Sequence, residues 1–408
     1  MRILRVIDTL DPRTGGPAAG LRALTPVLAA MGHETVIVTV DRPGANGAAF
    51  PHAEVHALGP AHGSHRWAPA LRPWLRRHLP AFDVVVVHGL WQSLGRTVRA
   101  VARETGVPYF IYPHGMLDPW FRGAYPLKHF KKWLYWRLVE GRVLRDATAV
   151  LYTCEEERRL ARESFSPYAC TERVVNYGTA GPPPESARQI AAWSQRQPEL
   201  DGRPFLLFLG RIHRKKGLDL LQAAYLTLAA RWAHPPALVV AGPENDPELR
   251  QQLLARAAAL PASARIIWTG MLEGDAKWGA LRRAEALVLP SHQENFGLAV
   301  VEALAVGVPV LISRQVNIWR EIVADGAGLA AADTAEGVDA LLAAWAGLPG
   351  DERAAMGRAA AASYARRFSI DAVARSFVEV VTPFVAARPA ASARSGAFRP
   401  PTALAPSP

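Results

Sequence analysis

Short apolar runs alternate with amphipathic segments along almost the whole chain. The run at residues 205–209 reads Phe-Leu-Leu-Phe-Leu, and the run at residues 84–87 consists of four valines. Strands that are apolar throughout are expected where helices cover both faces of a parallel sheet. Repeated alternation of such strands with helices predicts a doubly wound α/β fold. The chain has 408 residues, half of them hydrophobic, which is enough for two or three domains with cores of their own.

Two glutamates flank a loop and a helix start in residues 291–305. Glu294 follows an apolar strand predicted at residues 285–290, and Glu302 lies in the helix that comes next. Such sheets bind ligands at the carboxyl ends of their strands. Gly297 allows a ligand to approach the backbone closely, and a helix start offers free N–H groups to a phosphate. Two carboxylates beside an anion site suit a nucleotide sugar, which has hydroxyls at both ends and phosphates between them.

A second loop, after the strand at residues 205–209, is basic. Gly210 permits a tight turn, and Arg211 and Lys216 then stand at the strand end. Arginine offers a fork of donors and lysine a point charge, so a diphosphate can meet both. Lys215 is a further cation whose role the sequence leaves open.

The first strand of the chain is also followed by glycines. Residues 2–8 form the predicted strand, and Gly15 and Gly16 precede a predicted helix at residues 18–31. Strand, glycine loop and helix are the layout of a phosphate site, although a plain tight turn fits equally well. The pattern G-x-G-x-x-G does not occur, so this is not a dinucleotide fingerprint.

Two histidines end apolar strands and precede a glycine. His88 ends the strand at residues 83–88, and His114 lies at the end of the strand that begins at Tyr109 and ends in Pro113-His114-Gly115. A histidine at such a strand end faces the edge where ligands bind, with a packing or capping role as the alternative. For His88 a structural role is the stronger expectation.

These motifs together resemble the signature of retaining glycosyltransferases of family four. The match rests on Glu294 and Glu302 with Phe-Gly just after the first glutamate, and on Arg211 and Lys216 at the family's spacing in the basic loop. It is close in the C-terminal half and loose in the N-terminal half. The resemblance implies the GT-B fold, in which two Rossmann-like, doubly wound parallel-sheet domains face each other across a cleft.

The resemblance also implies roles for single residues. Glu294 would bind donor sugar hydroxyls, Glu302 would bind the ribose, and Met271 and Leu272 would contact the base. The implied donor contacts are Gly15, Gly16, Arg211, Lys216, Met271, Leu272, Glu294, Asn295, Phe296, Gly297, Leu298 and Glu302. The implied catalytic residues are His114, Arg211, Lys216 and Glu294, with His88 and Asp118 on the acceptor side. Arg211 and Lys216 would stabilise the leaving phosphate as negative charge develops on it, and His114 would orient the acceptor hydroxyl or share its proton. Asn295 stands where the family more often has glycine, which leaves the identity of the donor open.

A division of the chain follows from the same resemblance and from composition. The N-terminal, acceptor-side domain is predicted at residues 1–177, and the C-terminal, nucleotide-sugar-binding domain at 204–367. The Pro- and Gln-rich segment 178–203 is predicted to link them, with a short helix near Ile190. A helix at 368–385 is expected to pack back on the N-terminal domain. Residues 386–408, rich in Ala, Pro and Ser, are predicted to be disordered.

The implied activity is transfer of a hexosyl group from a nucleoside-diphosphate sugar to an acceptor hydroxyl with retention of configuration. No cofactor is expected, since the nucleotide sugar is a substrate. No Cys/His metal spacing and no Asp-x-Asp motif occurs, which argues against the metal-dependent class. Two alternatives stay open: a nucleotide-sugar 2-epimerase of the same fold, and a non-catalytic nucleotide-sugar-binding protein.

The charge of the chain points to anionic partners. The formal net charge is +11, and residues 120–145 interleave basic with aromatic side chains. The basic ones are Arg122, Lys128, Lys131, Lys132, Arg137, Arg142 and Arg145. A helix is predicted from Pro126 to about Leu144, and such an amphipathic helix suits an anionic membrane surface. A core helix with a solvated basic face is the equal alternative, and nucleic acid is not expected because no RNA-recognition signature is present.

The expected setting is cytoplasmic, on the inner face of the cell membrane where the acceptor is a lipid-linked or polysaccharide glycan. Two cysteines make no disulfide framework, no signal peptide is recognised, and no run of eighteen apolar residues occurs. Exopolysaccharide or lipopolysaccharide synthesis is the pathway that the resemblance suggests.

Overall fold

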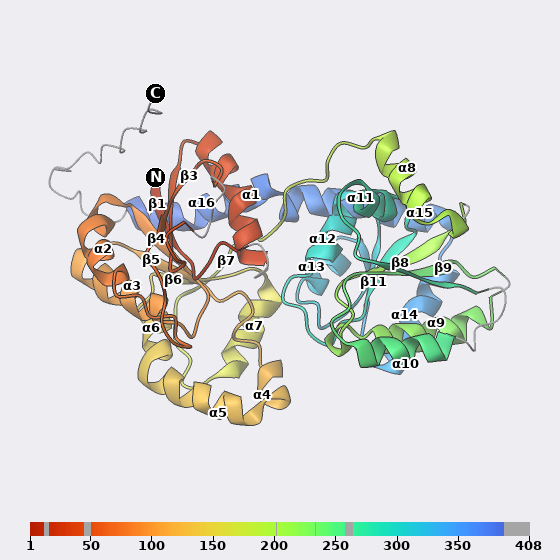
Figure 1. Ribbon diagram of the computed structural model, residues 1–408, viewed down its shortest axis with the longest axis horizontal. Helices are drawn as coiled ribbons and strands as arrows, with labels where there is room; N and C mark the ends of the chain where they lie inside the picture. The colour runs from red at the N-terminus through yellow and green to blue at the C-terminus, as the bar shows by residue number, and fades with distance from the viewer. Residues whose placement is uncertain (12–15, 45–49, 201, 233, 258–263, 387–408) are drawn as a thin grey trace.

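Two parallel β-sheets form the framework of the protein (Figure 1). The structure is a computed structural model, and it describes residues 1–11, 16–44, 50–200, 202–232, 234–257 and 264–386. Within these ranges one sheet has seven strands and the other has six. Neighbouring strands are parallel in both sheets, from the pair β1–β2 to the pair β12–β13. The predicted fold of two doubly wound, Rossmann-like domains is therefore confirmed.

The N-terminal sheet has the strand order β3-β2-β1-β4-β5-β6-β7. Its strands, in chain order, are β1 (Arg2–Val6), β2 (Glu34–Thr39), β3 (Ala53–Ala57), β4 (Val84–His88), β5 (Tyr109–Tyr112), β6 (Ala149–Tyr152) and β7 (Glu172–Val174). Its helices are α1 (Gly16–Ala30), α2 (Leu71–His78), α3 (Ser93–Thr105), α4 (Trp120–Ala124), α5 (Pro126–Tyr135), α6 (Gly141–Arg145) and α7 (Glu155–Ser164). The four central valines of β4 are fully buried, as a strand covered on both faces requires.

The C-terminal sheet has the order β10-β9-β8-β11-β12-β13. The strands are β8 (Phe205–Leu209), β9 (Ala237–Ala241), β10 (Ile266–Gly270), β11 (Ala286–Leu289), β12 (Val310–Ser313) and β13 (Gly328–Ala331). The helices are α8 (Ala187–Arg196), α9 (Leu218–Ala229), α10 (Pro247–Ala257), α11 (Gly274–Arg283), α12 (Leu298–Ala305), α13 (Trp319–Ala324), α14 (Ala335–Gly347), α15 (Gly350–Ser363) and α16 (Ile370–Ala386).

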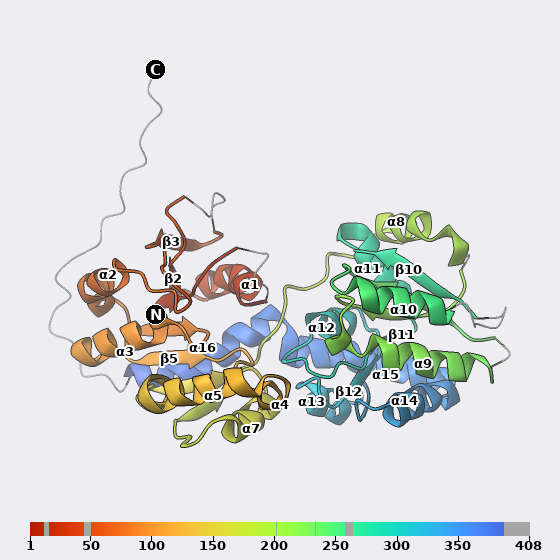
Figure 2. The same ribbon diagram turned by 60° about the horizontal axis from the view of Figure 1, so that its bottom comes forward.

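The last helix, α16, lies on the N-terminal sheet and not on the sheet that precedes it in the chain. Its side chains Val373, Phe377 and Val381 belong to a buried cluster with Ile3 of β1 and Val84 of β4. Figures 1 and 2 both show α16 running from the C-terminal lobe along the N-terminal one. The chain therefore crosses twice between the two sheets. The tail predicted to be disordered, from residue 387 on, lies outside the described residues.

The segment predicted as a linker, 178–203, contains a helix that belongs to a domain core. Helix α8 packs against α11, and Trp193 of α8 lies in the C-terminal core cluster. Gly279 of α11 is needed there, because a Cβ atom at this position would lie 2.1 Å from the carbonyl oxygen of Gln189. The predicted short helix near Ile190 is confirmed as α8.

The basic segment 120–145 is helical almost throughout but is not one regular helix. A π-helical turn at Trp136–Glu140 separates α5 from α6. The Trp136 side chain is buried there, and its indole N–H donates to the carbonyl oxygen of Pro167 at 2.8 Å. No helix among the described residues is both long and apolar enough to cross a lipid bilayer.

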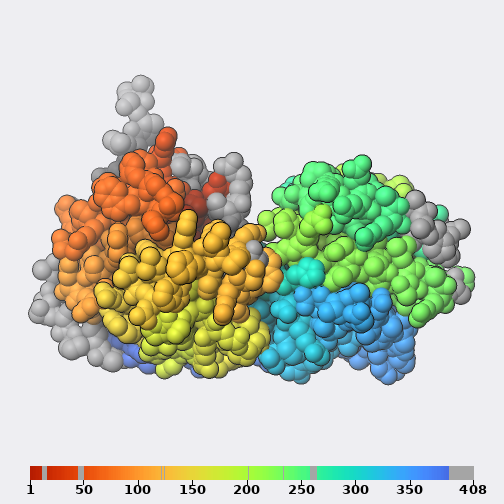
Figure 3. Space-filling view, turned by 90° about the horizontal axis from the view of Figure 1, so that it is seen from below, coloured from red at the N-terminus to blue at the C-terminus, as the bar shows by residue number. Residues whose placement is uncertain are grey.

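The two lobes touch along one side and are parted by a groove next to it (Figure 3). The contact joins the start of α7 to α13: Arg320 Nε donates to Glu156 Oε2 at 2.7 Å, and Glu156 is 5% exposed. In Figure 3 this is where the yellow surface of the N-terminal lobe meets the blue surface of the C-terminal lobe.

Candidate functional site

The predicted site residues cluster at the points where the strand order reverses. In the N-terminal sheet the chain moves outward from β1 to β3 and then returns to β4 on the other side of β1, and in the second sheet β8 and β11 are related in the same way. Doubly wound sheets bind ligands beyond the carboxyl ends of such strand pairs. The loops after β1, β8 and β11 lead to Gly16, Lys216 and Glu294, and His88 ends β4.

The basic loop after β8 is held in place by its own backbone. His213 begins a short 3-10 turn at Arg214–Lys216, since its ring accepts from the Lys215 N–H at 3.1 Å. Gly217 then starts α9 with a φ of +63°, and a Cβ atom there would lie 2.1 Å from the carbonyl oxygen of Pro290. Only glycine fits this position, so the loop and the end of β11 lie in direct contact.

Lys216 and Glu294 form an ion pair, which brings the basic and acidic motifs together. Their side chains are 14% and 22% exposed. The Glu294 backbone is fixed as well, because its N–H donates to the Gln315 carbonyl at 2.9 Å and its C=O accepts from the Asn317 N–H at 3.0 Å. Arg211 lies exposed at the start of the same basic loop. A carboxylate, which can accept hydrogen bonds from hydroxyls, and two cations, which can bind phosphate, thus lie at one crevice.

The other predicted donor contacts differ in how accessible they are. Glu302 pairs with Lys277 of α11 at 2.9 Å, and both side chains are about four-fifths buried. Met271 is 56% exposed, whereas Leu272 is 5% exposed and belongs to the C-terminal core. Of this pair, therefore, only Met271 has a side chain that can contact a base. Leu298 is 38% exposed.

On the N-terminal side, the two histidines and a buried arginine form a chain of contacts. His114 Nε2 lies 3.0 Å from His88 Nδ1, and His88 Nε2 lies 3.3 Å from an Arg5 nitrogen. Burial, followed by the charge of Arg5, lowers the pKa of His114 to about 4, and burial holds the pKa of His88 well below its usual range. Both imidazoles are thus neutral at neutral pH, so each has a ring nitrogen that can accept a hydrogen bond. Because His88 supports His114, its position fits the structural role expected for it.

Tyr177 joins this histidine chain to the loop after β11, residues 291–297. We call this the donor loop, or donor motif, because the donor contacts predicted there include Glu294 and Phe296. Its ring packs edge-on against His114 at 5.8 Å and against Phe296 at 5.0 Å between ring centroids. Its hydroxyl donates to the Gly16 carbonyl at 2.9 Å. A Cβ atom at Gly16 would lie 3.8 Å from the Leu298 side chain, so the start of α1 faces the donor motif across the groove. Gly15 lies outside the described residues.

The donor loop after β11 also contacts the N-terminal domain directly. Gln293 Nε2 donates to Asp118 Oδ2 at 2.8 Å in a buried bond. Asn295 approaches Gly115 so closely that a Cβ atom there would lie 2.6 Å from the Asn295 side chain. Asp118, predicted as an acceptor residue, is thus bonded to the neighbour of Glu294.

A buried carboxylate shapes the loop that makes these contacts. Glu157 accepts from the Gly115 N–H at 2.6 Å and from the Thr153 N–H at 2.7 Å. Burial raises the pKa of Glu157, while these hydrogen bonds oppose the rise. The carboxylate therefore ties the ends of β5 and β6 together beneath the groove.

Several residues of the site escaped sequence reasoning. They are Arg5, Thr153, Glu157, Lys277 and Gln293. Arg5 did carry a signal, since a charged residue inside an otherwise apolar strand is unusual. Lys215, left open by the sequence, lies over the Trp120 ring at 5.2 Å. Glu294, Lys216 and Asp118 are among the charges that act on its pKa, which burial lowers.

Binding a nucleotide sugar requires cations for the diphosphate and carboxylates for hydroxyls, at a crevice that a second domain can cover. All three requirements are met between the two sheets, and the fold supplies the covering domain. The class that fold and site define is the glycosyltransferases built from two Rossmann-like domains.

Comparison with known families gives the same answer. Residues 15–178 match the glycosyl transferase 4-like domain, and residues 189–363 match the glycosyl transferases group 1. The chain belongs to the group 1 glycosyltransferases, and the resemblance read from the sequence is confirmed.

Relatives and solved structures agree with this family. The chain is 27% identical over 351 residues to a GDP-mannose-dependent alpha-(1-6)-phosphatidylinositol dimannoside mannosyltransferase of Mycobacterium tuberculosis, covering 81% of this chain and 84% of the relative. It is 30% identical over 258 residues to a D-inositol 3-phosphate glycosyltransferase of Frankia alni, covering 60% of each. A glycosyltransferase structure from Rickettsia africae superposes with a TM-score of 0.71 at 16% identity, over 95% of this chain and 99% of that one, which shows the shared fold.

Proposed function

We propose that this protein is a retaining hexosyltransferase. It moves a hexosyl group from a nucleoside-diphosphate sugar to a hydroxyl of a lipid-linked or polysaccharide acceptor in cell-surface glycan synthesis. The name of the mycobacterial relative supports a hexosyl donor, and the names of both relatives support an acceptor that carries phosphate. The proposed setting is the cytoplasmic face of the cell membrane.

One observation carries the proposal: the ion pair of Lys216 with Glu294 between the ends of β8 and β11. In this pair the two charges neutralise each other. A bound donor offers each a better partner, a phosphate for the ammonium and sugar hydroxyls for the carboxylate. Arg211, exposed on the same loop, is the second cation for the diphosphate.

The proposed reaction is a front-face displacement. The bond between the anomeric carbon and the phosphate oxygen breaks, and the acceptor oxygen bonds to the same face of that carbon. The acceptor proton passes to the departing phosphate oxygen, whose negative charge Arg211 and Lys216 stabilise. His114, neutral because of burial and Arg5, would orient the acceptor hydroxyl through a hydrogen bond.

We also propose that these cations suffice without a metal ion. Activity that is unchanged after treatment with a chelator, and that no added divalent cation increases, is the expected result. Loss of activity on chelation, reversed by Mg²⁺ or Mn²⁺, would contradict this part of the proposal.

The test of the proposal is nucleotide release from a panel of UDP-, GDP- and ADP-sugars, with and without bacterial membrane extract. Release of one nucleotide, stimulated by the extract, is expected, and the anomeric configuration of the product by NMR tests retention. An epimerised sugar nucleotide without acceptor would identify a 2-epimerase. If no donor released its nucleotide and no nucleotide stabilised the protein thermally, the proposed transferase activity would be wrong.

A further inference from the structure

Exposed apolar side chains gather on one short stretch of the N-terminal domain. Twelve large hydrophobic residues are exposed in the part of the chain that the structure describes, and six of them lie between residues 125 and 138. These are Tyr125, Leu127, Phe130, Trp133, Leu134 and Leu138, with exposures from 37% to 81%. Helix α5 has no buried residue, whereas Trp136, Val143 and Leu144 further along the segment lie in the N-terminal core. The alternative of a core helix therefore holds for the second half of the segment and not for α5.

The helical period sorts these side chains onto distinct faces of α5. Leu127 and Leu134 are two turns apart on the outward face, and Leu138 of the following π turn extends it. Leu127 is 81% exposed, Leu134 52% and Leu138 58%, and we call these three the outer stripe. The stripe is flanked by exposed cations, among them Lys131 and Arg137. An apolar stripe between cations suits a helix that lies in the plane of an anionic lipid surface.

The other two faces of α5 line cavities. The inner cavity, of about 290 Å³, is lined by Met116, Asp118, Tyr125, Lys128, His129, Lys132, Ser164 and Phe165. The outer cavity, of about 470 Å³, includes Arg122, His129, Phe130 and Trp133 from the α4–α5 side and residues 162–166 from the other side. His129, Ser164 and Phe165 border both, so the two cavities are neighbours behind the helix, and we call the two together the groove.

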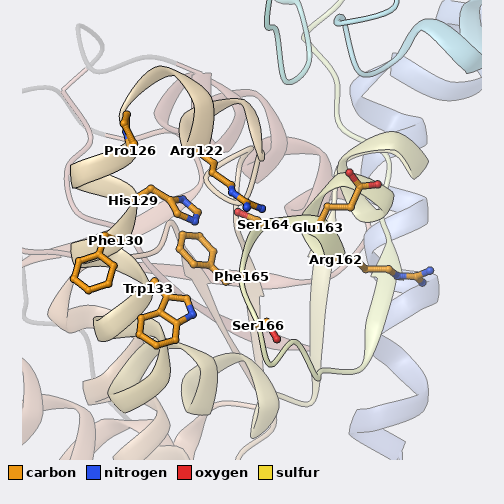
Figure 4. Close-up of a pocket in the computed structure, with 10 residues that line it drawn as sticks. All are labelled: Arg122, Pro126, His129, Phe130, Trp133, Arg162, Glu163, Ser164, Phe165 and Ser166. Atoms are coloured by element: carbon orange, nitrogen blue, oxygen red, sulfur yellow. The ribbon is translucent and has the colours of Figure 1, made fainter.

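Figure 4 shows how the outer cavity is built. The side chains of Arg122 and His129 point across it toward Ser164 and Phe165, while Phe130 lies on the far side, toward the surface of the helix. The His129 ring stacks on Phe165 with 4.5 Å between centroids. The outer end of the groove is therefore aromatic and lies next to the outer stripe.

The inner end of the groove is basic and reaches the site. Lys128 and Lys132 are its cationic side chains, His129 adds an imidazole that can donate to a phosphate, and Asp118 at its end is bonded to Gln293 beside Glu294. The cations crowd one another: burial and then Lys128 lower the pKa of Lys132 to about 8, and burial and then Arg122 lower that of His129. A phosphate in the groove would relieve this repulsion.

We propose that helix α5 docks on an anionic lipid bilayer and that the groove behind it receives the phosphate of a lipid acceptor. The outer stripe enters the acyl region, and Lys128, His129 and Lys132 bind the phosphate. The acceptor hydroxyl then lies toward Asp118 and the donor loop. This inference rests on the proposed function, and it identifies the acceptor of that reaction as a phosphate-bearing lipid.

The docking half is tested with the full chain and vesicles of phosphatidylcholine with and without phosphatidylglycerol. Wild-type protein should sediment with the anionic vesicles only, and added salt should release it. Leu134→Gln should lower the partition coefficient about tenfold, since a buried leucine is lost from the bilayer. Leu254→Gln is the matched control, because Leu254 is 39% exposed on α10 of the other domain. Equal binding by Leu134→Gln and wild type, or no preference for anionic vesicles, would overturn the docking surface.

The groove is tested with glycerol 3-phosphate, a lipid headgroup without acyl chains, by calorimetric titration. Lys128→Gln should weaken its binding at least about fivefold, the scale expected for one charged hydrogen bond. Lys131→Gln removes the same charge from the same helix, outside both cavities, and should bind the probe like wild type. If both variants bound glycerol 3-phosphate equally more weakly, the probe would be bound by the general basic charge of the surface. That result would overturn the phosphate site.

Two further outcomes separate this inference from its rivals. Wild-type protein that ignores vesicles but binds an anionic polysaccharide would make the groove a glycan site and the inference wrong. Nucleotide binding measured without vesicles tests the proposed function on its own, so failure of the donor chemistry and failure of the docking surface give different results.

Discussion

Lys216 and Glu294 neutralise each other, so removing either one leaves the other without its partner at the centre of the groove. We expect Glu294→Ala and Lys216→Ala to lower kcat/KM for transfer by about 10²- to 10³-fold, the scale of losing one preorganised charge contact. Both side chains keep some contact with water, so the fold should survive with a small change in Tm. Transfer rates and thermal unfolding of both variants check this.

Arg214→Ala is the matched control for those variants. Arg214 lies in the same basic loop, but it is more than half exposed and its guanidinium lies 3.5 Å from Asp246, away from Glu294. Near wild-type transfer is expected. If both Lys216→Ala and Glu294→Ala also retained near-normal transfer, the site assigned to this crevice would be wrong.

Glu140 is a buried acid whose charge costs stability. It is 1% exposed, its Oε1 accepts from the Trp91 N–H at 3.3 Å, and burial raises its pKa to about 7. Because the folded pKa lies above the unfolded value, the folded state holds the proton longer, and stability falls as pH rises from about 4.5 to 7. Glu140→Gln should therefore stabilise the protein by about 1 to 3 kcal/mol at pH 8 and by little at pH 4.5. Chemical unfolding at both pH values measures this, and an equal effect at both would contradict it.

Single residues were predictable from the sequence where a loop follows a buried strand. Glu294, Lys216 and His114 lie in such loops, and the structure places all three at the groove. Gln293 could not be predicted, because its partner Asp118 is 175 residues away and belongs to the other domain. Leu272 was expected to contact the donor, but its side chain is buried in the C-terminal core. The sequence could not show this, because the neighbouring Met271 in the same loop is exposed.

Among the elements, α9 depends on the glycine that begins it. Gly217 has a φ of +63° and no room for a side chain beneath Pro290. Gly217→Ala should destabilise the protein by about 1 to 3 kcal/mol and lower transfer, because the 3-10 turn that carries Lys216 must move. Unfolding free energy and donor affinity together measure this.

Gly274→Ala separates backbone strain from the lack of space. Gly274 begins α11 with a φ of +52°, but nothing lies within 4 Å of a Cβ atom there. The Gly274→Ala variant should lose about 1 kcal/mol of unfolding free energy through backbone strain, and its donor affinity should be unchanged. Equal losses in both glycine variants would mean that the contact with Pro290 is unimportant.

Most elements could be predicted because their signals are local. Apolar runs located the strands, and the glycines and prolines near their ends located the turns. The break between α5 and α6 could not be predicted, since it depends on Trp136 reaching Pro167 on a later loop. The placement of α8 on α11 was missed for the same reason: Gly279 and Gln189 meet only after folding.

For the whole molecule, the contact of Arg320 with Glu156 holds the lobes together on one side of the groove. Arg320→Glu would place two carboxylates against each other and favour a more open arrangement. We expect a larger radius of gyration by X-ray scattering and a roughly tenfold higher KM for acceptor, which corresponds to about 1.4 kcal/mol. The acceptor should bind more weakly because an open arrangement would separate Asp118 of the N-terminal lobe from the donor loop of the C-terminal lobe.

Arg314→Glu makes the same charge change on the segment just before α13. Arg314 is exposed and lies over the Trp319 ring at 5.6 Å rather than beside a carboxylate. The radius of gyration of the Arg314→Glu variant should match that of the wild-type protein. An equal expansion in both variants would show that net charge, and not this ion pair, sets the spacing of the lobes.

The donor loop after β11 also limits how such enzymes can be recombined. Within three consecutive residues, Gln293 contacts Asp118 of the other lobe, Glu294 contacts Lys216 of its own, and Asn295 lies against Gly115. A chimera that joins this C-terminal half to a foreign N-terminal half would inherit a loop shaped for a partner it no longer has. Exchange of halves between relatives should therefore succeed only when residues 113–118 travel together with residues 291–297.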